Sequence, residues 1–463
     1  MKYLLSALLL VAGLAVADAP LPNTPAGKIL GDFLVAFNSG DAAKVKAFNR
    51  RNGREQAPPD GLLEHREMSG GLTLLRVLES EPRKIVVLAQ EKDTERPLRI
   101  ELTATGGSAP IMDKFGIKGA ELPPDLAPKR LTQEAALRAL TERIDQLAKT
   151  DRFSGVVVIA RGDQILLQKA AGKSNRETGA DVTLETQFRL GSQNKMFTSV
   201  ATLQLVEAGK LALREPIGKY LTDYPNLDLA SKVTIHHLLS HTGGTGDIFG
   251  PQFDTNRLSL RTHGDYLKLY GARQLAFEPG SDDRYSNYGF VLLGALIEKV
   301  TGQSYYDYVR QKIFEPAGMS STASLPESET VPRRVTGYMR KEGRLVANTD
   351  TLPYRGTSAG GGYSTAGDML RFAKALEAGE LISKEMLRVA TSPQNKFGGY
   401  GYGLALQGTG KTHSYGHSGG APGMNADLRI FPELGYVIVA LSNLDPPAAS
   451  MLAEYYVARM PVD

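Results

Sequence analysis

The order of strand-like and helix-like segments after residue 130 most constrains what this chain can fold into. Two apolar runs, 155–160 and 164–169, flank an Arg161-Gly162-Asp163 turn, and four largely apolar or alternating runs return near the end of the chain, between 402 and 441. The long stretch between them spaces its apolar residues as helices do. Strands at both ends with helices between them predict an α+β domain over residues 131–463, with one antiparallel sheet, helices on its faces and a helical subdomain.

A proline-rich segment at 122–128 separates this domain from a smaller one. Residues 26–127 begin with helix-spaced apolar side chains, reach a turn in "FLVAFNSGD" and continue into three β-like runs at 72–78, 85–89 and 98–105. A domain of about a hundred residues is of ordinary size. In outline it resembles the small NTF2-like modules, a helix followed by antiparallel strands. We find no acid/base constellation in it, so the sequence predicts a small α+β accessory or dimerisation domain.

The first residues have the pattern of a secretory signal peptide. Lys2 precedes an apolar run at 3–16, and Ala15-Val16-Ala17 provides a small-x-small cleavage site. We therefore predict that residues 1–17 are removed and that the mature protein is periplasmic or secreted. A retained N-terminal anchor helix is the alternative. No later apolar run reaches the roughly 18 residues of a membrane span, so none is expected after cleavage.

The chain of 463 residues contains no cysteine. This excludes disulfides, iron–sulfur clusters, cysteine-ligated zinc, a thiol nucleophile and a lipid anchor at the cleavage site. A net charge of +4 is close to balance and does not favour nucleic acid as a partner, because nucleic-acid binding needs a concentrated basic face. Covalent catalysis, if present, would therefore use a hydroxyl group.

Two serines lie in motifs typical of nucleophiles. Gly416-His417-Ser418-Gly419-Gly420 matches the G-x-S-x-G elbow, but the α/β-hydrolases that carry this elbow place their histidine after the serine. The last of the seven histidines here is His417, so that order is impossible.

The second candidate is Ser192-Gln193-Asn194-Lys195, which follows a β-like segment and opens a predicted helix at 193–208. Free N–H groups and the positive end of the helix dipole favour developing negative charge at such a serine. Lys195 lies one turn later on the same face, and burial would lower its pKa enough for a neutral amine to accept a proton. Alone, S-x-x-K is a weak signal, since Ser192 could be only a helix cap and Lys195 only a surface residue.

Two further motifs strengthen the second candidate. Tyr285-Ser286-Asn287 precedes a predicted helix, and His417-Ser418-Gly419 lies on a late strand. The three motifs, in this order, resemble those of the serine β-lactamase and penicillin-recognising superfamily, in particular its branch of class C β-lactamases, D-Ala-D-Ala carboxypeptidases and related esterases. The stretches "HLLSHTGG" at 237–244 and "YSNYGFVLLGALIEKVTG" at 285–302 are also similar to this family, and the resemblance covers roughly residues 131–460.

The resemblance implies roles for these residues. Ser192 would attack a carbonyl and form an acyl-enzyme, while Lys195 and Tyr285 would share the proton. Asn287 would hold Lys195 and the substrate amide. The remaining substrate-binding and oxyanion-binding groups would be His417, Ser418 and Gly419, and the N–H groups of Ser192 and Gly420. No metal or other cofactor is implied.

The resemblance leaves the substrate open. His417 stands where β-lactamases usually carry lysine, and Gly420 stands where a hydroxyl residue often helps to hold a substrate carboxylate. We therefore predict an exported serine hydrolase that acts on a small amide or ester, as a peptidase or esterase, with material derived from peptidoglycan as one candidate substrate. A D-alanyl-D-alanine carboxypeptidase or β-lactamase, and a catalytically idle peptidoglycan-binding or sensor protein, are the alternatives. The sequence does not indicate an oligomeric state.

Three histidines lie close together at 236, 237 and 241. His237 and His241 are one helical turn apart, but the zinc-binding H-E-x-x-H motif needs a glutamate at 238, where this chain has leucine. The end of a helix before the Gly243-Gly244 turn is the expected structure there.

Overall fold

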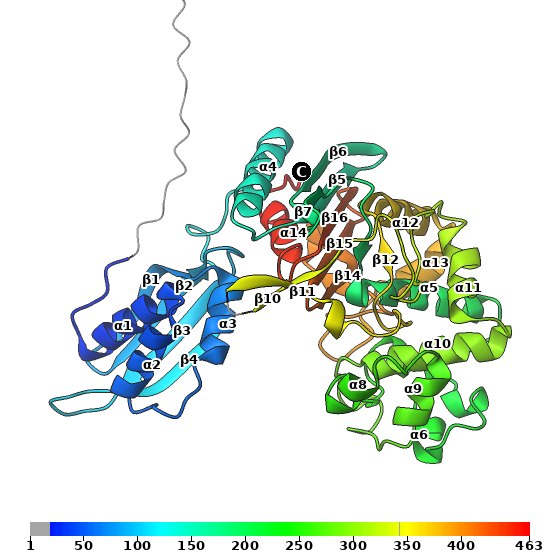
Figure 1. Ribbon diagram of the computed structural model, residues 1–463, viewed down its shortest axis with the longest axis horizontal. Coiled ribbons are helices and arrows are strands. Elements are labelled where there is room, and N and C mark those ends of the chain that lie inside the picture. The colour runs from blue at the N-terminus through cyan, green and yellow to red at the C-terminus, as the bar shows by residue number, and fades with distance from the viewer. Residues whose placement is uncertain (1–18, 342) are drawn as a thin grey trace, which may run out of the picture. The chain divides into compact units, whose positions relative to one another are not determined.

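The computed structural model describes residues 19–341 and 343–463, so the predicted signal peptide lies outside the described residues. The chain divides into two compact units between Ala127 and Pro128 (Figure 1). Within the described ranges, the structure contains no helix that is both long enough and apolar enough to cross a membrane.

The N-terminal unit packs three helices against a four-stranded antiparallel sheet with strand order β1-β2-β3-β4. The elements are α1 (Pro25–Ser39), α2 (Ala42–Arg51), α3 (Asp60–Ser69), β1 (Leu72–Glu81), β2 (Lys84–Glu91), β3 (Pro97–Ala104) and β4 (Met112–Gly119). Phe33 and Phe37 of α1 belong to the same buried core cluster as Ile100 of β3. The sequence predicts the first three strands but not β4, whose side chains are mostly exposed and therefore show no apolar alternation.

The C-terminal unit is built on a six-stranded antiparallel sheet with strand order β13-β14-β15-β16-β5-β6. Its strands are β5 (Gly155–Arg161), β6 (Gln164–Ala171), β13 (Ala405–Gln407), β14 (Ser414–Ala421), β15 (Met424–Phe431) and β16 (Tyr436–Ser442). β16 pairs with β5, with Ile438 opposite Ile159. The first hairpin of this unit thus joins the last strands of the chain, which confirms the predicted α+β architecture.

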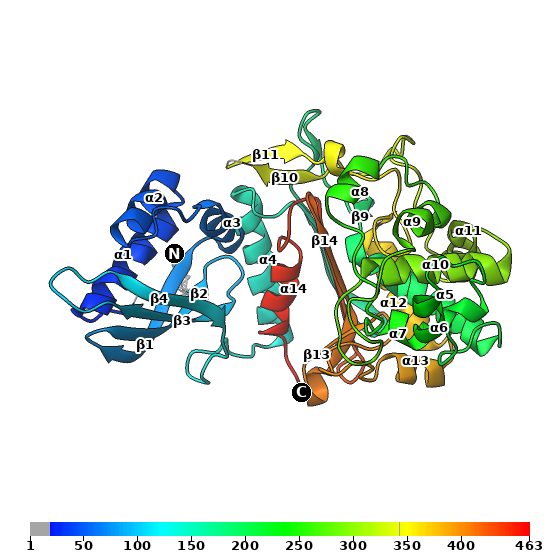
Figure 2. The ribbon, with the colours of Figure 1, turned by 90° about the horizontal axis from the view of Figure 1, so that it is seen from below.

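Helices cover both faces of this sheet (Figure 2). Val157 and Ile159 of β5 point to the face covered by α4 (Gln133–Lys149) and α14 (Ser450–Val457). Val156 and Val158 point to the opposite face, where α5 (Asn194–Glu207) and α12 (Ala366–Ala378) lie. This alternation follows from the two-residue period of a strand, and it explains why β5 is apolar throughout.

The helical subdomain lies on the α5 side of the sheet, and α10 (Asn287–Thr301) runs through its core (Figure 2). The helices around it are α6 (Leu227–Lys232), α7 (Ile235–Leu239), α8 (Pro251–Asn256), α9 (His263–Tyr270) and α11 (Tyr305–Val309), and α13 (Lys384–Ala390) packs on α12. Short paired strands complete the unit: β7 (Lys173–Asn175) with β8 (Ala180–Asp181), β9 (Phe188–Arg189) with β12 (Tyr363–Ser364), and β10 (Tyr338–Lys341) with β11 (Arg344–Ala347).

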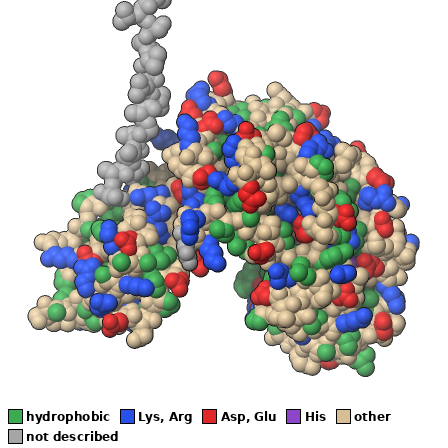
Figure 3. Space-filling model, in the orientation of Figure 1, with side chains coloured by type: hydrophobic (Ala, Val, Ile, Leu, Met, Phe, Trp, Pro, Cys, Tyr) green, Lys and Arg blue, Asp and Glu red, His purple; other side chains and the backbone are tan. Residues whose placement is uncertain are grey.

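The visible surface of the larger unit carries charges of both signs (Figure 3). Acidic and basic side chains are interspersed there, and the described residues on this face do not form a continuous basic stripe (Figure 3). This mixed surface agrees with the near balance of charge in the sequence.

Candidate active site

Ser192 lies on a tight turn between β9 and α5. The turn is a 3₁₀ segment, Gly191–Gln193, and Gly191 has a φ of 54°, a left-handed conformation that favours glycine. A Cβ atom at Gly191 would also lie only 2.8 Å from the backbone nitrogen of Gly420. The predicted nucleophile therefore sits at the start of a helix and directly beside β14.

Gly419 allows this close approach of β14. A Cβ atom there would lie 1.9 Å from the carbonyl oxygen of Leu190 and 3.0 Å from the backbone nitrogen of Ser192. The strand therefore brings the N–H group of the next residue, Gly420, into the neighbourhood of the Ser192 N–H. These are the two groups that the sequence analysis assigns to an oxyanion hole.

Lys195 is fully buried, and its ammonium nitrogen is surrounded by polar oxygens. Nζ lies 3.3 Å from Ser192 Oγ and 2.7 Å from Asn287 Oδ1, and it also donates to the carbonyl of Ala359. Burial lowers the pKa of Lys195 to about 7, although the negative charge of Asp247 acts in the opposite direction. A substantial fraction of the amine is therefore neutral near pH 7 and able to accept the proton of Ser192.

Tyr285 lies against both Ser192 and Lys195. Its phenol hydrogen-bonds Ser192, and Lys195 Nζ lies 4.7 Å from the centre of its ring. One side of the residue faces solvent, with 42% of its surface exposed, but desolvation of the phenol raises its pKa above the usual value of 10.0. Tyr285 is therefore a protonated donor at neutral pH in the free protein, which leaves Lys195 as the group able to take a proton.

Asn287 joins Lys195 to a carboxylate that the sequence analysis did not identify. Its Oδ1 accepts from Lys195, and its Nδ2 donates to Asp247 Oδ1 at 3.0 Å and Oδ2 at 3.1 Å. The two contacts fix which end of the amide faces the lysine. Asp247 follows "HLLSHTGG" by three residues, but nothing in the local sequence indicates that it reaches the first residue of α10.

His417 is buried, with 6% of its surface exposed, and its Nε2 lies 2.9 Å from the hydroxyl of Tyr400. Burial, together with the charge of Lys195, lowers the pKa of His417 to about 4, so the ring is neutral near pH 7. Ser418 is exposed and, by strand alternation, points to the opposite face of β14. The structure thus gathers Ser192, Lys195, Tyr285 and Asn287 and leaves the Ser418 side chain apart from them.

The β-lactamase family model matches residues 140–459, which is most of the C-terminal unit. The chain belongs to the β-lactamase family. It is similar to penicillin-binding protein 4* of Bacillus subtilis, with 29% identity over 65% of this chain and 70% of that protein. It is also similar to esterase EstB of Burkholderia gladioli, with 34% identity over 43% of this chain and 55% of that protein. A penicillin-binding protein of Bacillus halodurans has a similar structure, with a TM-score of 0.62, 30% identity, and coverage of 67% of this chain and 98% of that one.

Membership in the β-lactamase family makes the chain a serine hydrolase of the β-lactamase-related type. The fold confirms the resemblance on which the sequence analysis relied. The NTF2-like outline of the N-terminal unit stays a prediction.

His241 holds Tyr285 in place in this β-lactamase-family chain, whereas the sequence predicts only the end of a helix there. Its carbonyl accepts from the N–H of Arg284 at 3.0 Å, its Nδ1 accepts from the N–H of Ser286 at 3.1 Å, and its ring centre lies 4.3 Å from that of Tyr285. Its φ of 61° is rare for a residue with a side chain, so the surroundings determine this conformation. Burial lowers the pKa of His241 well below 6.5, which keeps the ring neutral.

The other two histidines of this cluster have structural partners. His236 Nδ1 lies 2.8 Å from the hydroxyl of Tyr402, and His237 Nδ1 accepts from the N–H of Thr234 in a capping box at the start of α7. The Nδ1 atom of each ring therefore bonds within the protein.

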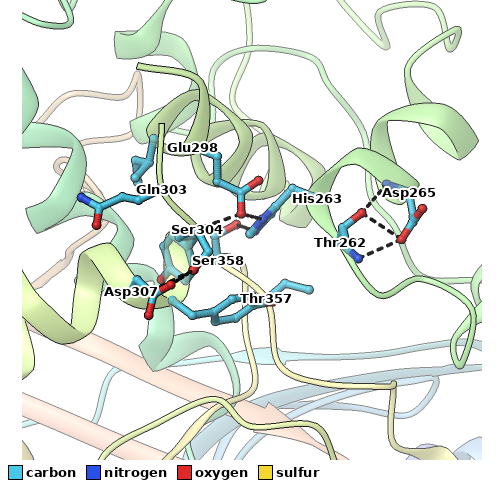
Figure 4. Close-up of polar contacts among 12 residues, drawn as sticks. Thr262, His263, Asp265, Glu298, Gln303, Ser304, Asp307, Thr357 and Ser358 are labelled. Carbon is cyan, nitrogen blue, oxygen red and sulfur yellow. Dashed lines mark hydrogen bonds and ion pairs between the residues drawn. The ribbon is translucent and has the colours of Figure 1, made fainter. Parts of the chain in front are cut away.

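A partly buried hydrogen-bond chain supports the backbone that contacts Lys195 (Figure 4). His263 lies between Glu298 and Ser358, with distances of 3.0 Å from Nδ1 to Glu298 Oε1 and 2.9 Å from Nε2 to Ser358 Oγ. Ser358 is fully buried, so a substrate does not reach it although the order of groups is that of a hydrolytic triad. The next residue, Ala359, accepts a hydrogen bond from Lys195. The hydrogen-bond chain through His263 therefore fixes one wall of the lysine site.

Replacing Gly419 with alanine is expected to disrupt the site. The added Cβ would overlap the carbonyl of Leu190, so β14 or the Ser192 turn must move. We expect kcat/KM to fall by at least about tenfold and the free energy of unfolding to fall by roughly 1–3 kcal/mol, as for other overpacked sites.

Chemical denaturation and steady-state kinetics would measure both effects. Gly116→Ala is the matched control, because Gly116 also lies in a strand and a Cβ there meets no atom within 4 Å. Unchanged stability and activity in Gly419→Ala would contradict the close packing of β14 on the turn.

Proposed function

We propose that this chain is an exported serine hydrolase that forms an acyl-enzyme on Ser192 with small amide or ester substrates. The observation that carries the proposal is the pairing of Ser192 Oγ, 3.3 Å away, with a buried lysine amine whose pKa is about 7. A surface lysine would be almost fully protonated at pH 7 and could not accept the serine proton.

In the acylation step, the Ser192 hydroxyl proton moves to the neutral amine of Lys195 while Oγ bonds to the substrate carbonyl carbon. The oxyanion forms between the N–H groups of Ser192 and Gly420, where each donor is worth on the order of 3–4 kcal/mol of barrier lowering. The bond to the leaving group then breaks as the Tyr285 phenol protonates the departing nitrogen or oxygen. Lys195 returns a proton to Tyr285, so both groups end in their starting states.

Deacylation reverses these proton transfers with water as the nucleophile. Water attacks the Ser192 ester, its proton passes to the Lys195–Tyr285 pair, and Oγ is released as a hydroxyl with the carboxylic acid product. Splitting hydrolysis into two steps lets one set of donors and acceptors serve both.

The position of His417 supports peptidase or esterase action over β-lactamase or carboxypeptidase action. The ring is buried and neutral near pH 7, so it supplies no positive charge for a substrate carboxylate. D-alanyl-D-alanine carboxypeptidase or β-lactamase activity is therefore the second candidate. An idle binding protein is disfavoured because a buried Lys195 costs stability and serves no packing need that a methionine could not meet. The signal-peptide pattern at 1–17 supports export to the periplasm or beyond.

Covalent labelling tests this proposal. The protein is treated with a fluorophosphonate and, separately, with a penicillin, and its intact mass is read. We expect a fluorophosphonate adduct in the natural chain and in Ser418→Ala but not in Ser192→Ala.

The two probes also separate the candidate functions. A stable penicillin adduct on Ser192 would favour the carboxypeptidase candidate, whereas hydrolysis of the penicillin without a stable adduct would favour the β-lactamase candidate. Absence of an adduct with either probe would exclude the hydrolase, and labelling lost only in Ser418→Ala would identify the other serine as the nucleophile.

A further inference from the structure

Asp247 carries an exposed carboxylate directly beside the residues of the candidate active site. Both of its oxygens accept from Asn287 Nδ2, and Oδ1 also accepts from the N–H groups of Ile248 at 2.6 Å and Phe249 at 3.4 Å. Its charge is close enough to affect the pKa values of Lys195 and Tyr285. Three of these four contacts fall on Oδ1, so Oδ2, which accepts only from Asn287, keeps a lone pair for a further donor.

Asp247 forms no ion pair with any of the residues that the structure describes. Arg273 is near, but its guanidinium donates to the carbonyl of Asp247 and packs over the ring of Tyr270, 4.0 Å from the ring centre. Lys195 is buried behind Asn287 and is already bonded to three oxygens. The carboxylate is therefore available to a cation that arrives with the substrate.

The place of such a cation follows from the proposed function, on which this inference rests. Under that proposal Asn287 lies beside the amide or acyl group next to the scissile carbonyl. Because Asn287 Nδ2 touches both oxygens of Asp247, a group on the carbon next to the scissile carbonyl would lie near the carboxylate. An ammonium group at that carbon would pair with it, and a carboxylate group there would be repelled.

We propose that Asp247 binds the protonated amine of the substrate, and that the preferred substrates are amides or esters of α-amino acids with a free amino group. The neighbouring Phe249 is 60% exposed and packs edge-to-face on Phe253 at 5.1 Å, so it offers apolar surface for the side chain of such a substrate. The site thus selects for a positive charge on the acyl side of the scissile bond.

Matched substrate pairs test this inference. Phenylalanine p-nitroanilide and its N-acetyl derivative, each in the D and L forms, are compared by kcat/KM. The natural chain is expected to prefer the free amine over the N-acetyl compound of the same chirality, and Asp247→Asn is expected to lower that ratio by roughly two- to fivefold, the usual scale for one exposed charge pair. Taking a ratio within each variant cancels any change in the pKa of Lys195, because that change affects both substrates alike.

Two variants control for structure and charge. Asp247→Glu keeps the carboxylate and should retain part of the preference. Asp254→Asn removes an exposed negative charge from the neighbouring α8 and should leave the ratio unchanged. Raising the salt concentration from about 0.02 M to about 0.5 M should weaken the preference of the natural chain, because exposed charge pairs are screened.

The possible outcomes separate this inference from the proposed function. An equal ratio in the natural chain and in Asp247→Asn, with both substrates hydrolysed, would overturn the role of Asp247 and leave the hydrolase intact. Hydrolysis of neither substrate, together with no fluorophosphonate adduct, would overturn the proposed function itself. A preference for the N-acetyl compound would also contradict the inference.

Discussion

Ser192→Ala is expected to lower kcat/KM by roughly 10⁴-fold or more for every substrate that the protein hydrolyses, as for other serine nucleophiles. No other described serine hydroxyl hydrogen-bonds Lys195, and the fully buried Ser358 bonds elsewhere. Removing Oγ leaves the lysine, the phenol and the oxyanion donors in place without a group to attack the carbonyl. Steady-state kinetics with p-nitrophenyl esters would measure the loss.

The fold should tolerate the Ser192→Ala substitution. Ser192 contributes one hydrogen bond of 3.3 Å to Lys195 and one to Tyr285, so the free energy of unfolding should change by no more than about 1–2 kcal/mol. Ser418→Ala is the matched control, since it removes an exposed hydroxyl from the other serine motif and should retain activity. A Ser192→Ala protein that keeps more than about a tenth of the activity would rule out a covalent intermediate at this residue.

Lys195→Met is expected to abolish turnover and to remove a distinct pH dependence of stability. The pKa of Lys195 falls from 10.5 to about 7 on folding, so between these values the unfolded chain binds more protons than the folded chain. The free energy of unfolding of the natural chain should therefore rise with pH in this window, by about 1.4 kcal/mol per pH unit at most. Between pH 7 and pH 9 the expected rise is about 2–3 kcal/mol.

The variant should lack this rise, because methionine does not titrate. Lowering the pKa of Lys195 to about 7 means that burying its charged amine costs about 5 kcal/mol of folding free energy at low pH. The hydrogen bonds lost at Asn287 and Ala359 cost roughly 1–3 kcal/mol each. These effects nearly cancel, so we expect the variant to be about as stable as the natural chain at pH 6 and less stable at pH 9.

Urea denaturation at several pH values would test this, with Lys299→Met as a control at an exposed lysine of α10. The same pKa should appear as the acid limb of kcat/KM near pH 7, because the free protein needs a neutral Lys195. The pKa of His417 lies near 4, well away from that limb. A stability curve that is flat from pH 7 to pH 9 in the natural chain would contradict a buried lysine with a lowered pKa.

The sequence predicts part of this site well and the rest not at all. Ser192 and Lys195 are three residues apart at the start of one helix, so local geometry alone brings them together. Tyr285 and Asn287 are recognised only through the order of three motifs, which the family match supports. Asp247 and His241 lie in loops that bring them into contact with the same active-site residues. No periodicity or spacing in the sequence predicts contacts of that kind.

The strands of the fold are likewise predictable from the sequence only in part. Strands β5 and β16 are apolar on both faces, β15 alternates, and β6 follows β5 across the Arg161-Gly162-Asp163 turn, so their positions follow from the sequence. The hairpin β10–β11 and strand β4 are short or charged, so they have no apolar pattern to recognise. The strand β14 extends from Ser414 to Ala421 and includes His417-Ser418-Gly419, as predicted, because β15 pairs with it along that length despite its glycines.

The most direct test of the account is to locate the acyl group that a substrate leaves on the protein. The natural chain is mixed with a p-nitrophenyl ester, quenched in acid within milliseconds, digested with trypsin and analysed by mass spectrometry. Cleavage after Arg189 and Lys195 isolates Ser192 in the peptide 190–195, whereas Ser418 lies in the peptide 412–429. We expect an acyl group on 190–195. An acyl group on 412–429, or none on either peptide during turnover, would contradict a covalent intermediate at Ser192.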